Sequence, residues 1–169
     1  MEKQGLGDYV VKRLGLKVGK PDLSDLEDYV ERFKSASKTI TLGMVGKYTK
    51  LKDSYISIIE SIQHASVALR VKPKLKWIES TYVELGKMTV EEALEGVNGL
   101  VILPGFGARG SEGKISIIKE ARENKIPMLG ICFGMQLAMV EYARNVLGFE
   151  KAHSTEIDPQ TPHPIIVLM

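Results

Sequence analysis

The chain has 169 residues, of which 44% are hydrophobic and 26% are charged, and its formal net charge is +2 at pH 7. This composition is typical of one globular domain with a sizeable core. The single cysteine excludes an intrachain disulfide framework and a cysteine-rich zinc module, so we expect no metal site and a reducing, cytoplasmic setting.

The charge and hydropathy patterns also exclude two classes of partner. A nucleic-acid-binding domain would carry a strongly basic footprint, which a net charge of +2 does not supply. No apolar run approaches the ~20 residues that cross a bilayer, and the N-terminus lacks the apolar segment of a signal peptide. We therefore expect neither nucleic acid nor a membrane as a partner.

Residues 1–37 differ in character from the rest of the chain. Asp8 can cap a short helix over residues 9–14, and Ser24 begins a capping box that predicts a second helix over residues 25–33. These helices carry too few apolar residues for a core of their own. We expect them to dock on the segment that follows.

From residue 38 onward, short β-branched apolar runs alternate with amphipathic segments, a pattern that predicts a parallel sheet wrapped by helices. The predicted strands cover residues 39–45, 74–78, 99–103, 127–131 and 165–168, and the predicted helices cover residues 53–69, 89–94, 113–123 and 133–147. The expected fold is α/β, with a doubly wound, mostly parallel sheet and flanking helices, in a flavodoxin-like topology. Because no helix follows the last strand, we expect the domain over residues 38–169 to be truncated at its C-terminus.

Residues 130–134, Gly-Ile-Cys-Phe-Gly, carry the strongest signal for chemistry, because they connect a predicted strand to a predicted helix. This is the spacing of a nucleophile elbow, in which flanking glycines permit a sharp turn that presents the central side chain. The helix N-terminus favours the thiolate form of Cys132, which is the attacking form. A buried core cysteine is the alternative, and the combination of strand, glycines and helix favours the nucleophile.

A second candidate segment, residues 104–110, is rich in glycine and follows the predicted strand over residues 99–103. Glycines let backbone N–H groups approach a ligand closely, as an oxyanion hole requires, although such loops also serve as simple turns. Both candidate loops follow the carboxyl ends of strands, where ligands bind in such sheets. The hypothesis is that Cys132 attacks an acyl carbonyl whose oxygen accepts hydrogen bonds from the N–H groups of Gly105 and Phe133.

Two further features are less informative. Residues 46–53 form a basic loop that lacks the spacing of a phosphate-binding loop and is interpreted as a solvated turn. An attacking cysteine usually needs a histidine base, and the candidates are His64, His153 and His163. None of them is a convincing base from its sequence context.

Residues 130–136, together with the Pro-Gly-Phe-Gly segment at residues 104–107, resemble the class I (triad) glutamine amidotransferases. The surrounding segments narrow the resemblance to the glutaminase half of the CTP synthase family; they are residues 4–10, 43–48, 120–127, 141–144 and 154–156. Within that resemblance, residues 1–37 match the interdomain linker region, and residues 38–169 match the amidotransferase domain.

The resemblance implies a half-reaction in which Cys132 attacks the side-chain amide of glutamine, ammonia leaves, and water hydrolyses the glutamyl thioester. The domain itself would need no cofactor. In the complete family enzyme, expected to be a homo-oligomer, an N-terminal synthetase domain would use this ammonia, ATP and Mg²⁺ to aminate UTP to CTP, with GTP as activator.

The resemblance also implies roles for individual residues beyond Cys132 and the oxyanion donors Gly105 and Phe133. The expected glutamine-binding residues are Phe106, Gln136 and Glu156, and the residues expected near the effector side are Arg109 and Glu112.

The sequence departs from the family pattern at two places. A single glycine, Gly105, stands where many relatives have two, and the His-x-Glu pair that completes the family's triad does not occur in these 169 residues. We therefore expect the chain to be inactive on its own. A non-catalytic binding module that retains the fold is the alternative function, and a redox-active cysteine protein of related topology is a third.

Overall fold

The computed structural model describes residues 4–167 and contains the expected α/β core. Its main sheet has four parallel strands in the order β2-β1-β3-β4, which are β1 (Lys38–Gly46), β2 (Val71–Glu79), β3 (Gly99–Ile102) and β4 (Met128–Gly130). This order matches the first four strands of a flavodoxin-like sheet. The predicted doubly wound α/β fold is confirmed.

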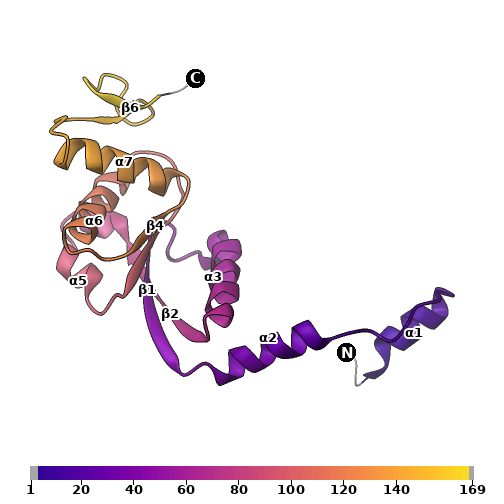
Figure 1. Cartoon of the computed structure of the whole chain (residues 1–169). Helices are drawn as coiled ribbons and strands as arrows, with labels where there is room; N and C mark the ends of the chain where they lie inside the picture. The colour runs from indigo at the N-terminus through magenta and orange to yellow at the C-terminus, as the bar shows by residue number, and fades with distance from the viewer. Residues whose placement is uncertain (1–3, 168–169) are drawn as a thin grey trace.

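Helices cover both faces of this sheet (Figure 1). One face carries the 3-10 helix η2 (Lys52–Tyr55) and α3 (Ile56–Ala68), and the other carries α5 (Val90–Leu94), α6 (Ser111–Glu123) and α7 (Phe133–Asn145). Alternate strand residues supply the two cores, because successive side chains of a strand point to opposite faces. Val45 and Ile102 pack with α6 and α7, whereas Met44 and Val101 pack with η2 and α3. The short helix α4 (Ser80–Glu84) was not predicted.

The predicted fifth strand, residues 165–168, does not join the main sheet. Residues 164–166 instead form β6 (Pro164–Ile166), which pairs in parallel with the two-residue strand β5 (His153–Ser154), and Leu168 lies outside the described residues. Ile157 and Ile165 pack against the core cluster that contains α7, so burial of these side chains holds the small sheet beside that helix (Figure 1). A pattern of apolar residues predicts a strand but does not specify which edge it will pair with.

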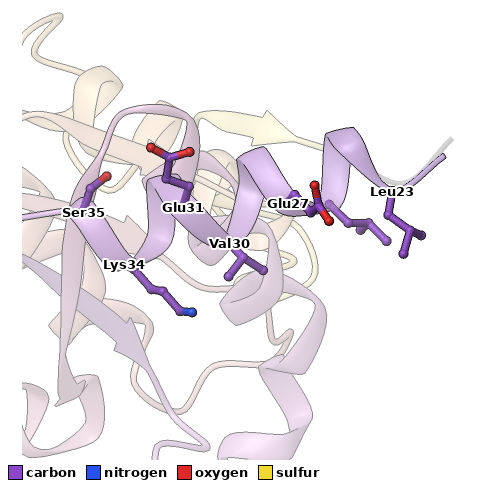
Figure 2. Close-up of a pocket in the computed structure, with 7 residues that line it drawn as sticks. Leu23, Glu27, Val30, Glu31, Lys34 and Ser35 are labelled. Atoms are coloured by element: carbon purple, nitrogen blue, oxygen red, sulfur yellow. The ribbon is translucent and has the colours of Figure 1, made fainter. Parts of the chain in front are cut away.

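The N-terminal helices α1 (Leu6–Arg13) and α2 (Ser24–Ser35) contain no buried residue. The expected docking is found in part for α2, where the Tyr29 ring meets the His64 ring of α3 edge-on at 5.8 Å, and is wrong for α1, which extends away from the domain in Figure 1. Figure 2 shows the side chains that line a shallow pocket on the surface of α2, among them the apolar Leu23 and Val30 and the charged Lys34. No helix in residues 4–167 has the length and hydrophobicity of a membrane span.

The close approach of α7 to β3 gives the first testable prediction. A Cβ atom at Gly134 would overlap the backbone carbonyl of Ile102, and backbone cannot move away as a flexible side chain can. We expect Gly134→Ala to lower the free energy of unfolding by about 2 kcal/mol, a typical cost of overpacking. Urea denaturation measures this, with Gly19→Ala as the control because a Cβ at Gly19 meets no atom within 4 Å. Equal losses in the two variants would contradict the prediction.

Candidate active site

Cys132 lies in the turn between β4 and α7, as predicted. Its backbone has φ 53° and ψ −114°, which an L-residue adopts only where the surrounding structure enforces it. Hydrogen bonds on both sides hold the turn: Ile131 N–H donates to the Ile102 carbonyl at 3.0 Å, and Gly134 N–H donates to the Ile131 carbonyl at 2.9 Å. The thiol is free and exposed. The parent strand β4 lies at the edge of the described sheet and not at its centre.

The glycine-rich segment after β3 lies beside this turn. Gly105 has φ 126° and Gly107 has φ 91°, in the region that favours glycine, so the loop conformation requires these residues. The Phe106 and Phe133 rings pack together with their centroids 5.3 Å apart. The two segments that carry the predicted oxyanion donors, Gly105 and Phe133, are therefore neighbours, and the role of their N–H groups stays a prediction.

Phe106, Gln136 and Glu156 line one cavity of about 240 Å³. They come from the segment after β3, from α7 and from the loop after β5, and the remaining lining residues are Ser154, Thr155, Ile166 and Val167. The Glu156 carboxylate accepts a hydrogen bond from Gly107 N–H at 3.0 Å. The structure thus brings together the three residues expected to bind glutamine, and the small β5–β6 sheet supplies one wall of their cavity.

Arg109 and Glu112, both expected on the effector side, contact different parts of the protein. The Arg109 guanidinium lies 5.7 Å from the centre of the Tyr48 ring. Glu112 forms an ion pair with Arg144 at 2.8 Å, and its Oε1 lies 3.3 Å from His153 Nε2. Glu112 therefore connects α6 to α7 and β5.

None of the three histidines hydrogen-bonds to the Cys132 thiol within residues 4–167. His64 contacts Tyr29 and His163 stacks on Phe149. His153 is buried, and its Nδ1 accepts a hydrogen bond from Ser154 N–H at 2.9 Å. Burial and, secondarily, the Arg144 charge lower the pKa of His153. In this part of the chain, no group of three His, Cys, Asp or Glu side chains could hold a metal ion.

The sequence did not reveal two buried lysines, Lys47 and Lys114, whose ammonium groups contact backbone carbonyls within or just before the glycine-rich segment. Lys114 is 1% exposed, and its Nζ donates to the Leu103 carbonyl at 2.7 Å. Lys47 is 6% exposed, so the solvated turn expected over residues 46–53 is wrong at this position. Helical spacing could have revealed Lys114, because it lies three and four residues before the core residues Ile117 and Ile118.

Burial and, secondarily, the Lys47 charge lower the pKa of Lys114, while Cys132 and Glu79 raise it, and the net result is a pKa of about 8. The Lys114 Nζ also lies 5.8 Å from the centre of the Phe133 ring. The Lys114 ammonium group therefore lies near Phe133, the residue that follows Cys132, and it is almost completely shielded from water.

Comparison with known proteins identifies the family. Residues 50–165 match the family model described as glutamine amidotransferase class-I. The chain therefore belongs to the class-I glutamine amidotransferase family, and the family resemblance inferred from the sequence is confirmed.

Within that family the chain is similar to CTP synthases. It is 56% identical over 169 residues to the CTP synthase of Sulfurisphaera tokodaii, covering 100% of this chain and 32% of the relative. It is also 56% identical to that of Pyrococcus furiosus, covering 100% of this chain and 31% of the relative. The chain spans about a third of the length of these curated relatives.

A solved structure shows the same fold. The glutaminase domain of Trypanosoma brucei CTPS, described with bound acivicin, aligns with a TM-score of 0.70 and 32% sequence identity. The alignment covers 77% of this chain and 50% of that chain.

The perturbed lysine gives the second prediction. The pKa of Lys114 is about 8 in the folded chain, against 10.5 for an ordinary lysine. Between these values the unfolded chain binds more protons, so this residue makes the free energy of unfolding rise with pH. Urea titrations of the native chain and of Lys114→Met across this range should show the native chain gaining stability relative to the variant. Two curves that stay parallel would contradict the lowered pKa.

Proposed function

We propose that this chain is the glutaminase part of a CTP synthase, which hydrolyses glutamine to glutamate and ammonia. The observation that carries the proposal is the cavity shared by Phe106, Gln136 and Glu156, next to a strained turn that exposes Cys132. The likeness to CTP synthases over the whole chain supports it.

The proposed chemistry follows from the groups in the site. The Cys132 thiolate attacks the side-chain amide carbon of glutamine, and N–H groups of Gly105 and Phe133 stabilise the resulting oxyanion. The Glu156 carboxylate complements the α-ammonium group, and the amide of Gln136 binds the substrate backbone. Collapse of the tetrahedral intermediate breaks the C–N bond, and the departing amino group takes a proton from solvent and leaves as ammonia. Water then hydrolyses the thioester to glutamate and the free Cys132 thiol.

The proposal for the whole protein rests on the relatives, of which this chain spans about a third. We propose that the ammonia serves an ATP- and Mg²⁺-dependent amination of UTP to CTP in a synthetase domain, with GTP as activator, in a cytoplasmic homo-oligomer. Residues 1–37 would then form the linker to that domain. The exposed apolar side chains of α1 and α2 are compatible with a linker.

Covalent labelling tests the glutamine site. We expect a diazo-ketone analogue of glutamine to add one molecule per chain at Cys132, the single cysteine, and excess glutamine to slow the reaction. Intact-mass spectrometry measures the rate, and Cys132→Ala should remain unlabelled. Glu156→Gln should react about tenfold more slowly, because the carboxylate that complements the α-ammonium group is neutralised.

Iodoacetamide, which needs no glutamine cavity, is the control reagent and should label the native chain and Glu156→Gln at equal rates. Equal labelling of the native chain and Cys132→Ala by the analogue would refute the assignment of Cys132.

Catalytic turnover gives a separate prediction. A thiol without a general base attacks slowly, and no partner protonates the departing amino group. Loss of one triad member costs orders of magnitude in rate. No His-x-Glu sequence occurs in these 169 residues. We expect ammonia release from glutamine at least ~10³-fold slower than that of the full-length Pyrococcus furiosus CTP synthase. Comparable turnover would mean that a residue of this chain is the base, and His153 would be substituted first.

A further inference from the structure

Lys47 is a buried cation for which the proposed chemistry assigns no task. It follows β1 directly, and its side chain extends toward the glycine-rich segment after β3. The Lys47 ammonium donates to the Phe106 carbonyl and, at 3.4 Å, to the Gly107 carbonyl. Both carbonyls belong to the segment between the predicted oxyanion donor Gly105 and α6. One ammonium group therefore restrains two consecutive peptide groups of this segment.

The opposite side of the peptide between Phe106 and Gly107 faces Glu156, one of the residues that line the cavity. In a trans peptide the carbonyl and the following N–H point in opposite directions, and the described chain has no cis peptide bond. The Phe106 carbonyl points to Lys47, so the Gly107 N–H points away from it, toward Glu156 Oε1 at 3.0 Å. The peptide between Phe106 and Gly107 thus lies between an ammonium group and a carboxylate.

This peptide needs an external restraint. Gly107 has φ 91°, and a glycine permits peptide orientations that other residues do not. Rotation of the peptide would turn the Phe106 carbonyl oxygen toward the Glu156 carboxylate, and two acceptors would then face each other. Ser111 Oγ donates to the Gly107 carbonyl at 3.0 Å, but Lys47 is the group that holds the Phe106 carbonyl itself.

We propose that Lys47 is a positioning residue for glutamine binding, because its hold on the Phe106 carbonyl directs the Gly107 N–H to Glu156 and keeps that carboxylate at the wall of the cavity. The identity of the ligand, glutamine, rests on the proposed function, whereas the contacts of Lys47 and Gly107 are observed in the structure. Lys47 acts on the affinity for the amino-acid end of the substrate. It does not act on the thiol that reacts.

The first test separates binding from reaction. Labelling rates of the native chain and Lys47→Met are measured over a range of concentrations of the diazo-ketone analogue of glutamine. We expect Lys47→Met to raise the half-saturating concentration about tenfold, to change the maximal rate less than twofold, and to leave the iodoacetamide rate unchanged. Lys47→Arg, which keeps a cation and donors, should recover most of the affinity.

The matched control is Lys50→Met, because Lys50 is an exposed lysine of the same loop and should behave as the native chain does. A Lys47→Met variant with native half-saturation, or one that loses maximal rate and iodoacetamide reactivity together with affinity, would overturn the proposal.

The second test is independent of glutamine chemistry. Amide hydrogen exchange, followed by nuclear magnetic resonance, should show the Gly107 N–H protected in the native chain and in Lys50→Met, and at least tenfold faster to exchange in Lys47→Met. Rapid exchange of Gly107 in the native chain overturns the proposal even if circular dichroism shows that Lys47→Met does not fold. Failure of the native chain to react with the glutamine analogue, with Gly107 protected as expected, would instead refute the proposed function.

Discussion

The site depends on one close approach, in which Gly134 of α7 packs directly against the backbone carbonyl of Ile102 in β3. That contact places the first turn of α7 beside the end of β3, and the Ile102 carbonyl also accepts the hydrogen bond from Ile131 N–H. With the helix fixed there, the two residues between β4 and α7 must turn sharply. Cys132 consequently takes a conformation that a side-chain-bearing residue adopts only under such constraint.

The same approach brings two loops together. Phe133, the first residue of α7, packs its ring on Phe106 of the segment after β3, and the Lys114 ammonium lies close to that ring. A charge buried in this way costs free energy, and the lowered pKa of Lys114 reflects that cost. Lys47 donates to two carbonyls of the glycine-rich segment, and Lys114 donates to the carbonyl of Leu103, the residue just before it. Lys47 thereby holds the Phe106 carbonyl on one side of its peptide group, while the Gly107 N–H on the other side donates to Glu156, which lines the cavity.

The cavity is completed by residues that lie late in the sequence. Glu156 and its neighbours reach the site because β5 and β6 form a separate small sheet beside α7. Arg144 contributes to that arrangement, since it donates to the Ala152 carbonyl at 2.6 Å and pairs with Glu112 of α6. His153 lies within this network, with Nδ1 bonded to the Ser154 backbone and Nε2 near Glu112. These contacts hold the loop that carries Glu156.

The sequence by itself determined the parallel α/β core, the position of Cys132 in a strand-to-helix turn, and the family resemblance. Those features depend on local patterns: alternating apolar runs, and glycines at fixed spacing around one residue. The pairing of β6 with β5, the separate environments of Arg109 and Glu112, and the buried positions of Lys47 and Lys114 were decided by the tertiary structure alone. Each of them depends on contacts between residues distant in the chain, where burial and hydrogen-bond partners, and not local propensity, select the arrangement.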